Sequence, residues 1–249
     1  MSAMKKWFLT ATLLSLYLLC SGGKPYEWLK PFPFGASCFN QCLIETVDHG
    51  YVILIVKYHS GVPYVTSFLI RTDINGIILW YKEFRDGLNA YNLFHVVQTS
   101  DKGYILTGST SKYDPTGYFD PVIIKLSPCG ELEWCSNIST PGIYDNAFRI
   151  RQMPSGEYVL LTSYSDPAEN NRIQLYKLSS TGQWLWKRNY PAVPPFFGDD
   201  GNDVTVLDDG FLVSGKCYAP DPGMQPGVGY ERPYFFRTDT AGNVLWRNV

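Results

Sequence analysis

The chain has 249 residues, of which 45% are hydrophobic, 16% aromatic and 18% charged, a composition typical of a packed globular protein. Its formal net charge of −2 gives no electrostatic basis for nucleic-acid binding, so we exclude that class of partner. The 22 Gly and 17 Pro residues favour many short strands and turns over long helices.

Residues 1–23 have the layout of a secretory signal peptide. Lys5 and Lys6 precede an apolar run over residues 7–19, and small residues follow it. The run is shorter than the roughly 20 residues of a membrane-spanning helix. We therefore expect the protein to be exported.

Cys20 allows two interpretations of this signal. A Cys that ends the apolar run and precedes Ser-Gly-Gly resembles a bacterial lipoprotein signal, in which that Cys is lipidated, although Leu19 departs from the small residue usual before it. Ordinary cleavage after Gly22 or Gly23 is the alternative. The expected location is an outer-membrane or cell-surface lipoprotein, or a freely secreted protein. Contact with a membrane is expected only through an N-terminal lipid anchor.

A Pro-rich tether is predicted over residues 24–39, and the remainder, 40–249, carries one string four times. The string is [KR]-x-[DS]-x-x-G-x-x-x-W. Its recurrence at intervals of roughly 50–60 residues is the mark of a repeat architecture. The Gly and Trp of the four copies are Gly76 and Trp80, Gly130 and Trp134, Gly182 and Trp186, and Gly242 and Trp246.

A second landmark of each repeat is a turn Gly followed by a short apolar strand. These glycines are Gly50, Gly103, Gly156 and Gly210. Around the two landmarks each repeat has four short runs rich in β-branched and aromatic residues. Four antiparallel strands in a unit of about 40–60 residues form one blade of a β-propeller. We predict an all-β, propeller-like array of four four-stranded blades, over about 40–84, 85–139, 140–193 and 194–249.

The third and fourth copies, KLSSTGQWLW at 177–186 and RTDTAGNVLW at 237–246, resemble the repeat of quinoprotein-like (PQQ-like) β-propellers found in secreted and surface proteins of bacteria. The resemblance covers residues 40–249 and implies the propeller fold. The dehydrogenases of that family, as the resemblance implies, have eight blades, an adjacent Cys pair and an acidic calcium site. Four repeats without adjacent Cys residues depart from that pattern, so we predict no quinone cofactor.

The repeat residues have predicted structural roles. The Gly is expected to close the turn between the third and fourth strands, and the polar residue three places before it to bond the turn backbone. The Trp is expected to wedge against the next blade, so Trp246 should be less buried than Trp134. Three arrangements remain open: a closed four-bladed ring, an open arc, or two chains that form one larger ring as a homodimer.

The connections between the second and third strands of each repeat are long and variable, and residues 218–233 form the longest. Long loops on a rigid scaffold usually carry function. We therefore predict that a protein or glycan ligand binds on the face that bears them. The candidate ligand-binding residues are Tyr113, Tyr118, Asp120, Asp145, Asp199, Asp221, Tyr230 and Arg232.

Three polar residues on this face, Asn92, Asp145 and Asp199, stand at the same spacing before the turn Gly of their repeats. They could ring the axis and hold a cation or polar ligand, or they could cap turns between blades. The acidic run at 199–203 hints at calcium, but it lacks the spaced ligands of a known calcium loop. No other metal or cofactor is predicted.

No catalytic residue can be assigned from the sequence. The three His residues have no Ser-His-Asp or Cys-His spacing, and a paired-carboxylate hydrolase leaves no spacing signature. The leading prediction is a secreted or surface-anchored, non-catalytic binding module. The alternatives are a structural scaffold or fragment of a longer propeller protein, and a glycan hydrolase or lyase.

Overall fold

A computed structural model describes residues 34, 37–60, 65–87, 89–112, 119–138, 144–166, 170–191, 197–220 and 229–248. The chain divides into two units, Met1–Pro33 and Phe34–Val249, and every described residue belongs to the second. The signal peptide, with Cys20, and most of the tether lie outside the described residues. The part of the chain that is described contains no helix long and apolar enough to cross a membrane.

Sixteen strands form four antiparallel sheets, and each sheet pairs four strands in chain order. The first sheet has β1 (Cys38–Glu45), β2 (Tyr51–Tyr58), β3 (Val65–Thr72) and β4 (Ile78–Phe84); the second has β5 (Tyr91–Gln98), β6 (Tyr104–Thr110), β7 (Asp120–Leu126) and β8 (Leu132–Asn137). The third has β9 (Tyr144–Gln152), β10 (Tyr158–Asp166), β11 (Asn170–Leu178) and β12 (Trp184–Tyr190); the fourth has β13 (Phe197–Leu207), β14 (Gly210–Pro220), β15 (Gly229–Asp239) and β16 (Val244–Asn248).

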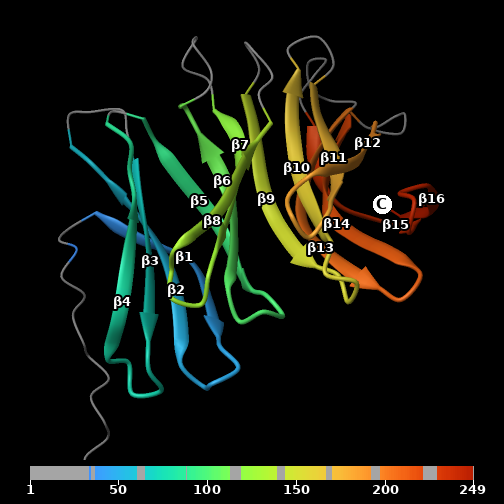
Figure 1. Ribbon diagram of the computed structural model, residues 1–249. Helices are drawn as coiled ribbons and strands as arrows, with labels where there is room; N and C mark the ends of the chain where they lie inside the picture. Colours follow the sequence, from blue (N-terminus) through green and yellow to red (C-terminus); the bar gives the residue numbers. More distant parts are fainter. Residues whose placement is uncertain are drawn as a thin grey trace, which may run out of the picture. The chain divides into compact units, whose positions relative to one another are not determined.

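The prediction of an all-β array of four four-stranded blades is confirmed. In each sheet, short turns join the first strand to the second and the third to the fourth, so these turns meet at one end, as the first sheet shows (Figure 1). The second-to-third connections and the sheet-to-sheet connections meet at the other end. We name these the turn end and the long-loop end. β1 begins at Cys38, inside the region expected to be tether.

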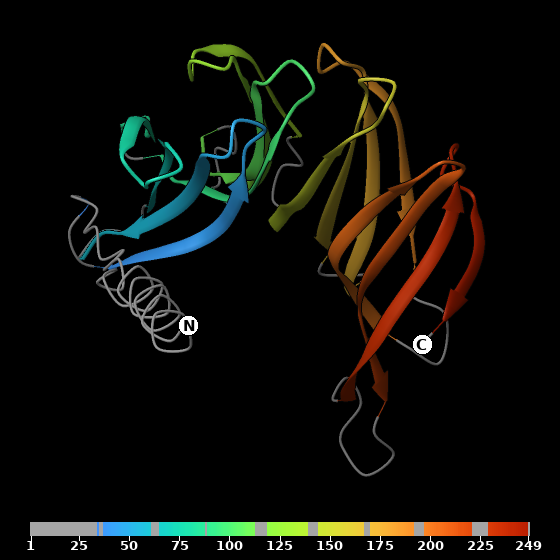
Figure 2. The same ribbon diagram turned by 90° about the horizontal axis from the view of Figure 1, so that it is seen from below.

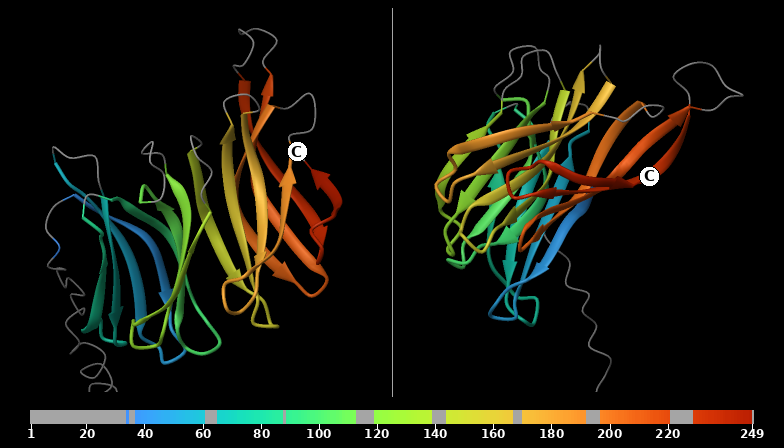
Figure 3. Two further views of the ribbon diagram at one scale, coloured as in Figure 1. Left: turned by 45° about the horizontal axis from the view of Figure 1, so that its top comes forward. Right: turned by 90° about the vertical axis from the view of Figure 1, so that its right-hand side faces the viewer.

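Both ends of the expected loop at 218–233 are strands of a β-hairpin, over 218–220 and 229–233, so the expectation of a loop there was wrong. β14 and β15 stay paired from Gly210 and Asp239 out to Pro220 and Gly229, and Figure 3 shows this hairpin projecting past the neighbouring strands. The ladder satisfies backbone groups that a loop would leave to solvent. The other half of the expected loop, 221–228, lies outside the described residues.

The core lies between consecutive sheets. Because the middle strands are covered on both faces, β3, β6 and β7 are buried along their whole length, as expected of near-continuous apolar runs. One apolar cluster joins Leu54 and Leu69 of the first sheet to Leu93 and Leu106 of the second. The outer strands β12 and β16 are mostly exposed, whereas β4 and β8 mix exposed and partly buried positions.

Packing between sheets follows chain order (Figure 2). The innermost strand β5 packs on the first sheet, β9 on the second and β13 on the third. Within the described part of the chain, no comparable interface joins the first sheet to the fourth, as a closed four-bladed ring would require.

Three of the four repeat Trp residues pack against the next sheet at the turn end, as predicted. The ring of Trp134, for example, lies 2.8 Å from where a Cβ on Gly182 would stand, and meets Tyr158 edge to face at 6.0 Å between ring centroids. We call this contact the Trp–Gly latch. The three latches are Trp80 with Gly130 and Tyr104, Trp134 with Gly182 and Tyr158, and Trp186 with Gly242 and Phe211.

The fourth repeat Trp has no such partner among the described residues. Trp246 is 43% exposed, whereas Trp134 is partly buried. The predicted order of burial is therefore confirmed. Trp246 instead meets Phe235 of its own sheet, at 6.0 Å between centroids.

The turn at each repeat Gly has a left-handed backbone conformation, which Gly adopts readily. Gly182 has φ of 81°, and the other three repeat glycines lie between 73° and 82°, a region that favours Gly. The side chain three places before the Gly accepts from the turn backbone, as Asp73 does from Asn75 at 2.8 Å and from Ile77 at 2.7 Å. Both predicted roles are confirmed.

The first residue of the repeat has a role that the sequence prediction missed. Its cation reaches a carboxylate in or beside the first hairpin turn of the same sheet, and the recurrence of both partners was the available signal. The pairs are Arg71 with Asp48, Lys125 with Asp101, Lys177 with Glu157, and Arg237 with Asp209.

Candidate ligand site at the long-loop end

Three carboxylates are buried at the long-loop end of the second, third and fourth sheets. Asp120 begins β7, Asp145 is the second residue of β9, and Asp199 is the third residue of β13; their exposed fractions are 0%, 3% and 1%. The backbone N–H of Asp145 donates to the carbonyl of Phe119 at 3.0 Å, which ties the second and third sheets together here. Burying a carboxylate is costly, so three at one end of the sheets mark a functional-site candidate.

Asp199 is the most unusual of the three. Both of its carboxylate oxygens are buried and have no hydrogen-bond partner among the described residues. Burial raises the pKa of Asp199 to about 6; Arg172 and Arg247 act against this shift, and Asp200 adds to it. The carboxyl group can therefore accept or donate hydrogen bonds that the described residues do not supply.

Asp145 lies beside aromatic and cationic side chains of its own sheet. It is opposite Tyr164 in the ladder, and the Nζ of Lys187 lies 5.7 Å from the Tyr164 ring centroid and 5.3 Å from that of Tyr176. Burial lowers the pKa of Lys187, while Asp145 opposes that shift. The Tyr176 hydroxyl donates to Gln174 Oε1 at 3.0 Å. Rings, a cation and a carboxylate of this kind suit a ligand with both apolar and hydroxyl faces.

Asn92 does not join the two aspartates in a ring. Each inner strand has a β-bulge, and Asp145 and Asp199 both stand three residues before the bulged residue, whereas Asn92 stands two before it. Its counterparts are therefore Asn146 and Asp200. Since successive strand residues face opposite sides, Asn92 faces away from the aspartate side. The three residues have equal spacing to the turn Gly in the sequence only because that Gly does not occupy the same place in each turn.

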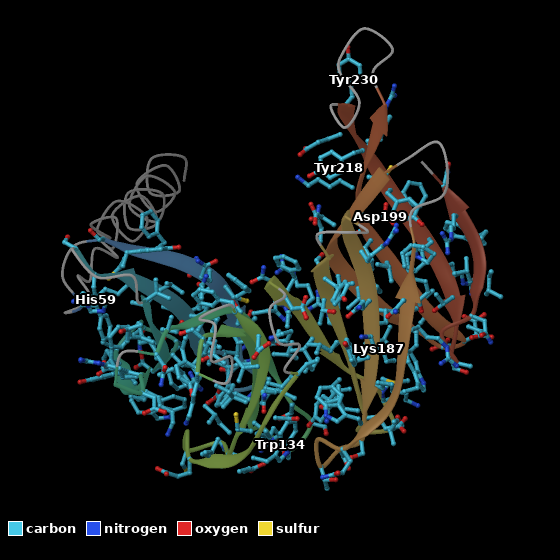
Figure 4. All side chains as sticks on the ribbon, turned by 90° about the horizontal axis from the view of Figure 1, so that it is seen from above. His59, Trp134, Lys187, Asp199, Tyr218 and Tyr230 are labelled. Atoms are coloured by element: carbon cyan, nitrogen blue, oxygen red, sulfur yellow. The ribbon has the colours of Figure 1, made fainter. Side chains whose placement is uncertain are left out.

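The hairpin of the fourth sheet carries the other described candidates. Arg232 is opposite Cys217, which is in turn opposite Asp199, so the three share one row across the sheet. Tyr230 is 56% exposed, and Figure 4 shows it farther along the hairpin than Asp199 and Tyr218. Three further candidates, Tyr113, Tyr118 and Asp221, lie outside the described residues.

The opposite side of the same hairpin carries a group that the sequence prediction missed. The Tyr218 hydroxyl donates to Asp200 Oδ2 at 3.2 Å, and Lys216 Nζ lies 5.5 Å from the Tyr218 ring centroid. Lys216 also pairs with Glu231 at 2.5 Å. Strand pairing brings these residues together, so the group could not be predicted while this segment was expected to be a loop.

His95 belongs to a second network that no sequence pattern indicated. It is 6% exposed; its Nδ1 accepts from the N–H of Ile150 at 3.4 Å, and its Nε2 lies 3.3 Å from Arg151 Nη1. Arg151 also donates to Asp203 at 2.9 Å. Burial, reinforced by the charges of Arg151 and Arg149, lowers the pKa of His95 to about 3. This network ties β5, β9 and β13 together.

The calcium hint at 199–203 gains no geometric support. The described residues contain no group of three or more His, Cys, Asp or Glu side chains that could hold a metal ion. Asp199 and Asp200 are neighbours on a strand and face opposite sides, and Asp203 is engaged by Arg151.

Comparisons with known proteins show the fold. No family model and no curated protein matches the sequence, so the quinoprotein-like resemblance gains no family match. A thermostable family-43 glycoside hydrolase is similar in structure, at 13% identity and a TM-score of 0.52, over 82% of this chain and 73% of that one. The GH93 α-L-arabinofuranosidase of Fusarium graminearum, solved with arabinobiose, is similar at 12% identity and a TM-score of 0.56, over 83% of this chain and 64% of that one.

Proposed function

We propose that this protein is a glycan-binding module and that the ligand lies at the long-loop end of the third and fourth sheets. The buried Asp199, whose carboxylate oxygens have no partner among the described residues, carries the proposal. A sugar offers several hydroxyl groups, and each can donate a hydrogen bond to such an oxygen. Asp145 occupies the equivalent position one sheet earlier.

The fold likeness supports a glycan over a protein ligand. The similar structures named above are glycoside hydrolases, and the Fusarium graminearum enzyme was solved with arabinobiose. The ring of Tyr164 and the cation of Lys187 beside Asp145 could pack on a sugar ring and hydrogen-bond its hydroxyls. The chain is thus proposed to bind a neutral oligosaccharide, for which arabinobiose is the first probe.

Titration calorimetry of the full chain with arabinobiose and a panel of neutral oligosaccharides tests this function. We expect binding by at least one of them, and we expect Asp199→Asn to weaken it by about 10- to 100-fold, the effect of losing hydrogen bonds to a charged acceptor. Asp208→Asn is the matched control, because Asp208 is exposed at the turn end. Equal losses from both substitutions, or no binding to any panel member, would refute the proposal.

Hydrolysis of the bound glycan is the second candidate. The observation that favours it is the pKa of Asp199, raised to about 6 by burial, which suits a general acid near neutral pH. Asp145 or Asp120 would supply the second carboxylate of a hydrolase pair. Release of reducing sugar from a ligand that the calorimetry identifies, abolished by Asp199→Asn, would establish turnover; a stable complex would leave binding as the activity.

We also propose export, with Cys20 as the lipid attachment site. The sequence pattern at residues 1–23 is the support for this proposal. Metabolic labelling with a fatty acid, compared between the native chain and Cys20→Ser, distinguishes a lipoprotein from a freely secreted protein.

A further inference from the structure

The two end sheets expose the two halves of the Trp–Gly latch. On the fourth sheet the exposed half is Trp246, at 43%. On the first sheet the corresponding receptor is Gly76 with Tyr51, since Gly130 with Tyr104 receives Trp80 in the next sheet along. Gly76 and Tyr51 are both partly exposed, whereas Tyr104 and Tyr158 are 2% exposed.

A hollow surrounds Trp246 at the turn end of the fourth sheet. Its volume is about 690 Å³, and its lining is Leu207, Asp208, Asp209, Leu212, Phe235, Arg237 and Trp246. Leu212 and Trp246 hold the positions that Val159 and Trp186 hold on the third sheet, where the fourth sheet covers them. The hollow therefore lies where a further sheet of the same repeat would pack.

The first sheet exposes more apolar side chains on its outer strand and the preceding turn than the other sheets do. Ile74, Ile77, Leu79 and Tyr81 are 53%, 54%, 57% and 57% exposed. The position of Leu79 is also an exposed Leu in the third and fourth sheets, at Leu185 and Leu245. At the position of Ile77 the other repeats have Glu131, Gln183 and Asn243, and at the position of Tyr81 they have Cys135, Lys187 and Arg247. Exposed apolar side chains gathered on one strand and its turn favour an interaction surface.

Phe34 covers only one part of this side of the first sheet. It packs on Phe68 at 4.7 Å and on Tyr81 at 5.4 Å between centroids. Phe68 lies toward the long-loop end of β3, whereas Tyr51 pairs with Thr72 at the turn end. The contact therefore leaves Tyr51 and Gly76 partly exposed.

We propose that a second copy of this chain covers both surfaces: Trp246 of one copy latches onto Gly76 and Tyr51 of the other, beside the stripe of Ile74, Ile77 and Leu79. The new interface continues the one that already joins consecutive sheets three times within the chain. Because it joins the fourth sheet to the first, it is head to tail, and two copies satisfy both ends when they close on each other.

Sedimentation equilibrium of the full chain over a range of concentrations tests this assembly. We expect a dimer, and we expect Trp246→Ser and Leu79→Lys each to raise its dissociation constant by roughly 30-fold or more, as for an interface hot spot. The matched controls are Trp184→Ser and Leu132→Lys, because Trp184 is 41% and Leu132 57% exposed on the outer strands of the inner sheets. Circular dichroism confirms that each variant is folded.

The pattern of effects separates this assembly from others. A mixture of the two disruptive variants retains one intact junction, so it should dimerise more tightly than either variant alone. A monomeric native chain, loss of dimer with only one of the two variants, or equal loss with the controls would overturn the proposal. Loss with Trp246→Ser alone would indicate a symmetric contact between fourth sheets.

Discussion

At the scale of single residues, two buried ionisable side chains differ in whether they have hydrogen-bond partners. His95 and Asp199 are both almost fully buried, but His95 has hydrogen-bond partners on the neighbouring strand, whereas the Asp199 oxygens have none among the described residues. His95 therefore joins inner strands. Asp199 lowers the stability of the fold, because its buried carboxylate lacks hydrogen bonds that a ligand could supply.

Acid should destabilise the protein through His95. Its pKa in the folded chain is about 3, below the ordinary 6.5, so the unfolded chain binds the extra proton and stability falls as the pH drops from about 6.5 toward 3. The contribution at pH 4 is on the order of 3 kcal/mol. In denaturant unfolding between pH 7 and 4, the free energy of unfolding should fall less for His95→Gln than for the native chain. It should fall as much as in the native chain for His49→Gln, which alters an exposed side chain.

Asp199 should affect the pH dependence of stability in the opposite direction, destabilising the fold as the pH rises. Its pKa of about 6 lies above the ordinary 3.8, so the folded chain binds the proton more tightly and the buried charge destabilises the fold above pH 6. Asp199→Asn should therefore raise the free energy of unfolding at pH 8 by on the order of 2–3 kcal/mol, and the gain should fade below pH 4. A variant less stable than the native chain at pH 8 would contradict this assignment.

The candidate residues show how far sequence reasoning reached at this scale. Asp120, Asp145 and Asp199 were predicted to lie on one face and do so. Their neighbours were not predictable, because bulges and turn lengths set the register that separates Asn92 from Asp145. The contact of His95 with Arg151 likewise depends on how two sheets pack.

At the scale of the elements, the Trp–Gly latch is the repeated unit of cohesion. The repeat Gly makes a turn with positive φ, and its missing Cβ lets the Trp of the preceding sheet lie against it. Both roles were predictable, because Gly and Trp recur together at a fixed offset. The extended β14–β15 hairpin was not, since its Pro and Gly residues favour a loop and only pairing across the ladder reveals the strands.

Removing a latch should cost more inside the array than at its end. Trp134→Ala loses a ring packed on Gly182 and Tyr158, so the free energy of unfolding should fall by about 3 kcal/mol. Trp246→Ala loses a ring that is 43% exposed, and a fall of about 1 kcal/mol or less is expected under conditions where the chain is monomeric. Equal losses in urea unfolding would contradict the latch.

At the scale of the whole molecule, the fold is shown more firmly than the function. Four repeats with two landmarks each predicted the four sheets, because every blade must bury the same faces. The proposed function depends on the long-loop end, where the sequence varies between repeats. The likeness to solved glycoside hydrolases, at 13% and 12% identity, shows the fold. The buried Asp199 carries the proposed glycan site, and the exposed ends of the array lead to the proposed pairing of two chains.

The most direct test of the proposed glycan site measures stability and affinity on the same pair of proteins, the native chain and Asp199→Asn. If Asp199 is held without hydrogen bonds for a ligand, the substitution should raise the free energy of unfolding at pH 8 and weaken binding of the best panel oligosaccharide by about 10- to 100-fold. A substitution that lowers stability and leaves affinity unchanged would show that Asp199 serves the fold and that the glycan site lies elsewhere.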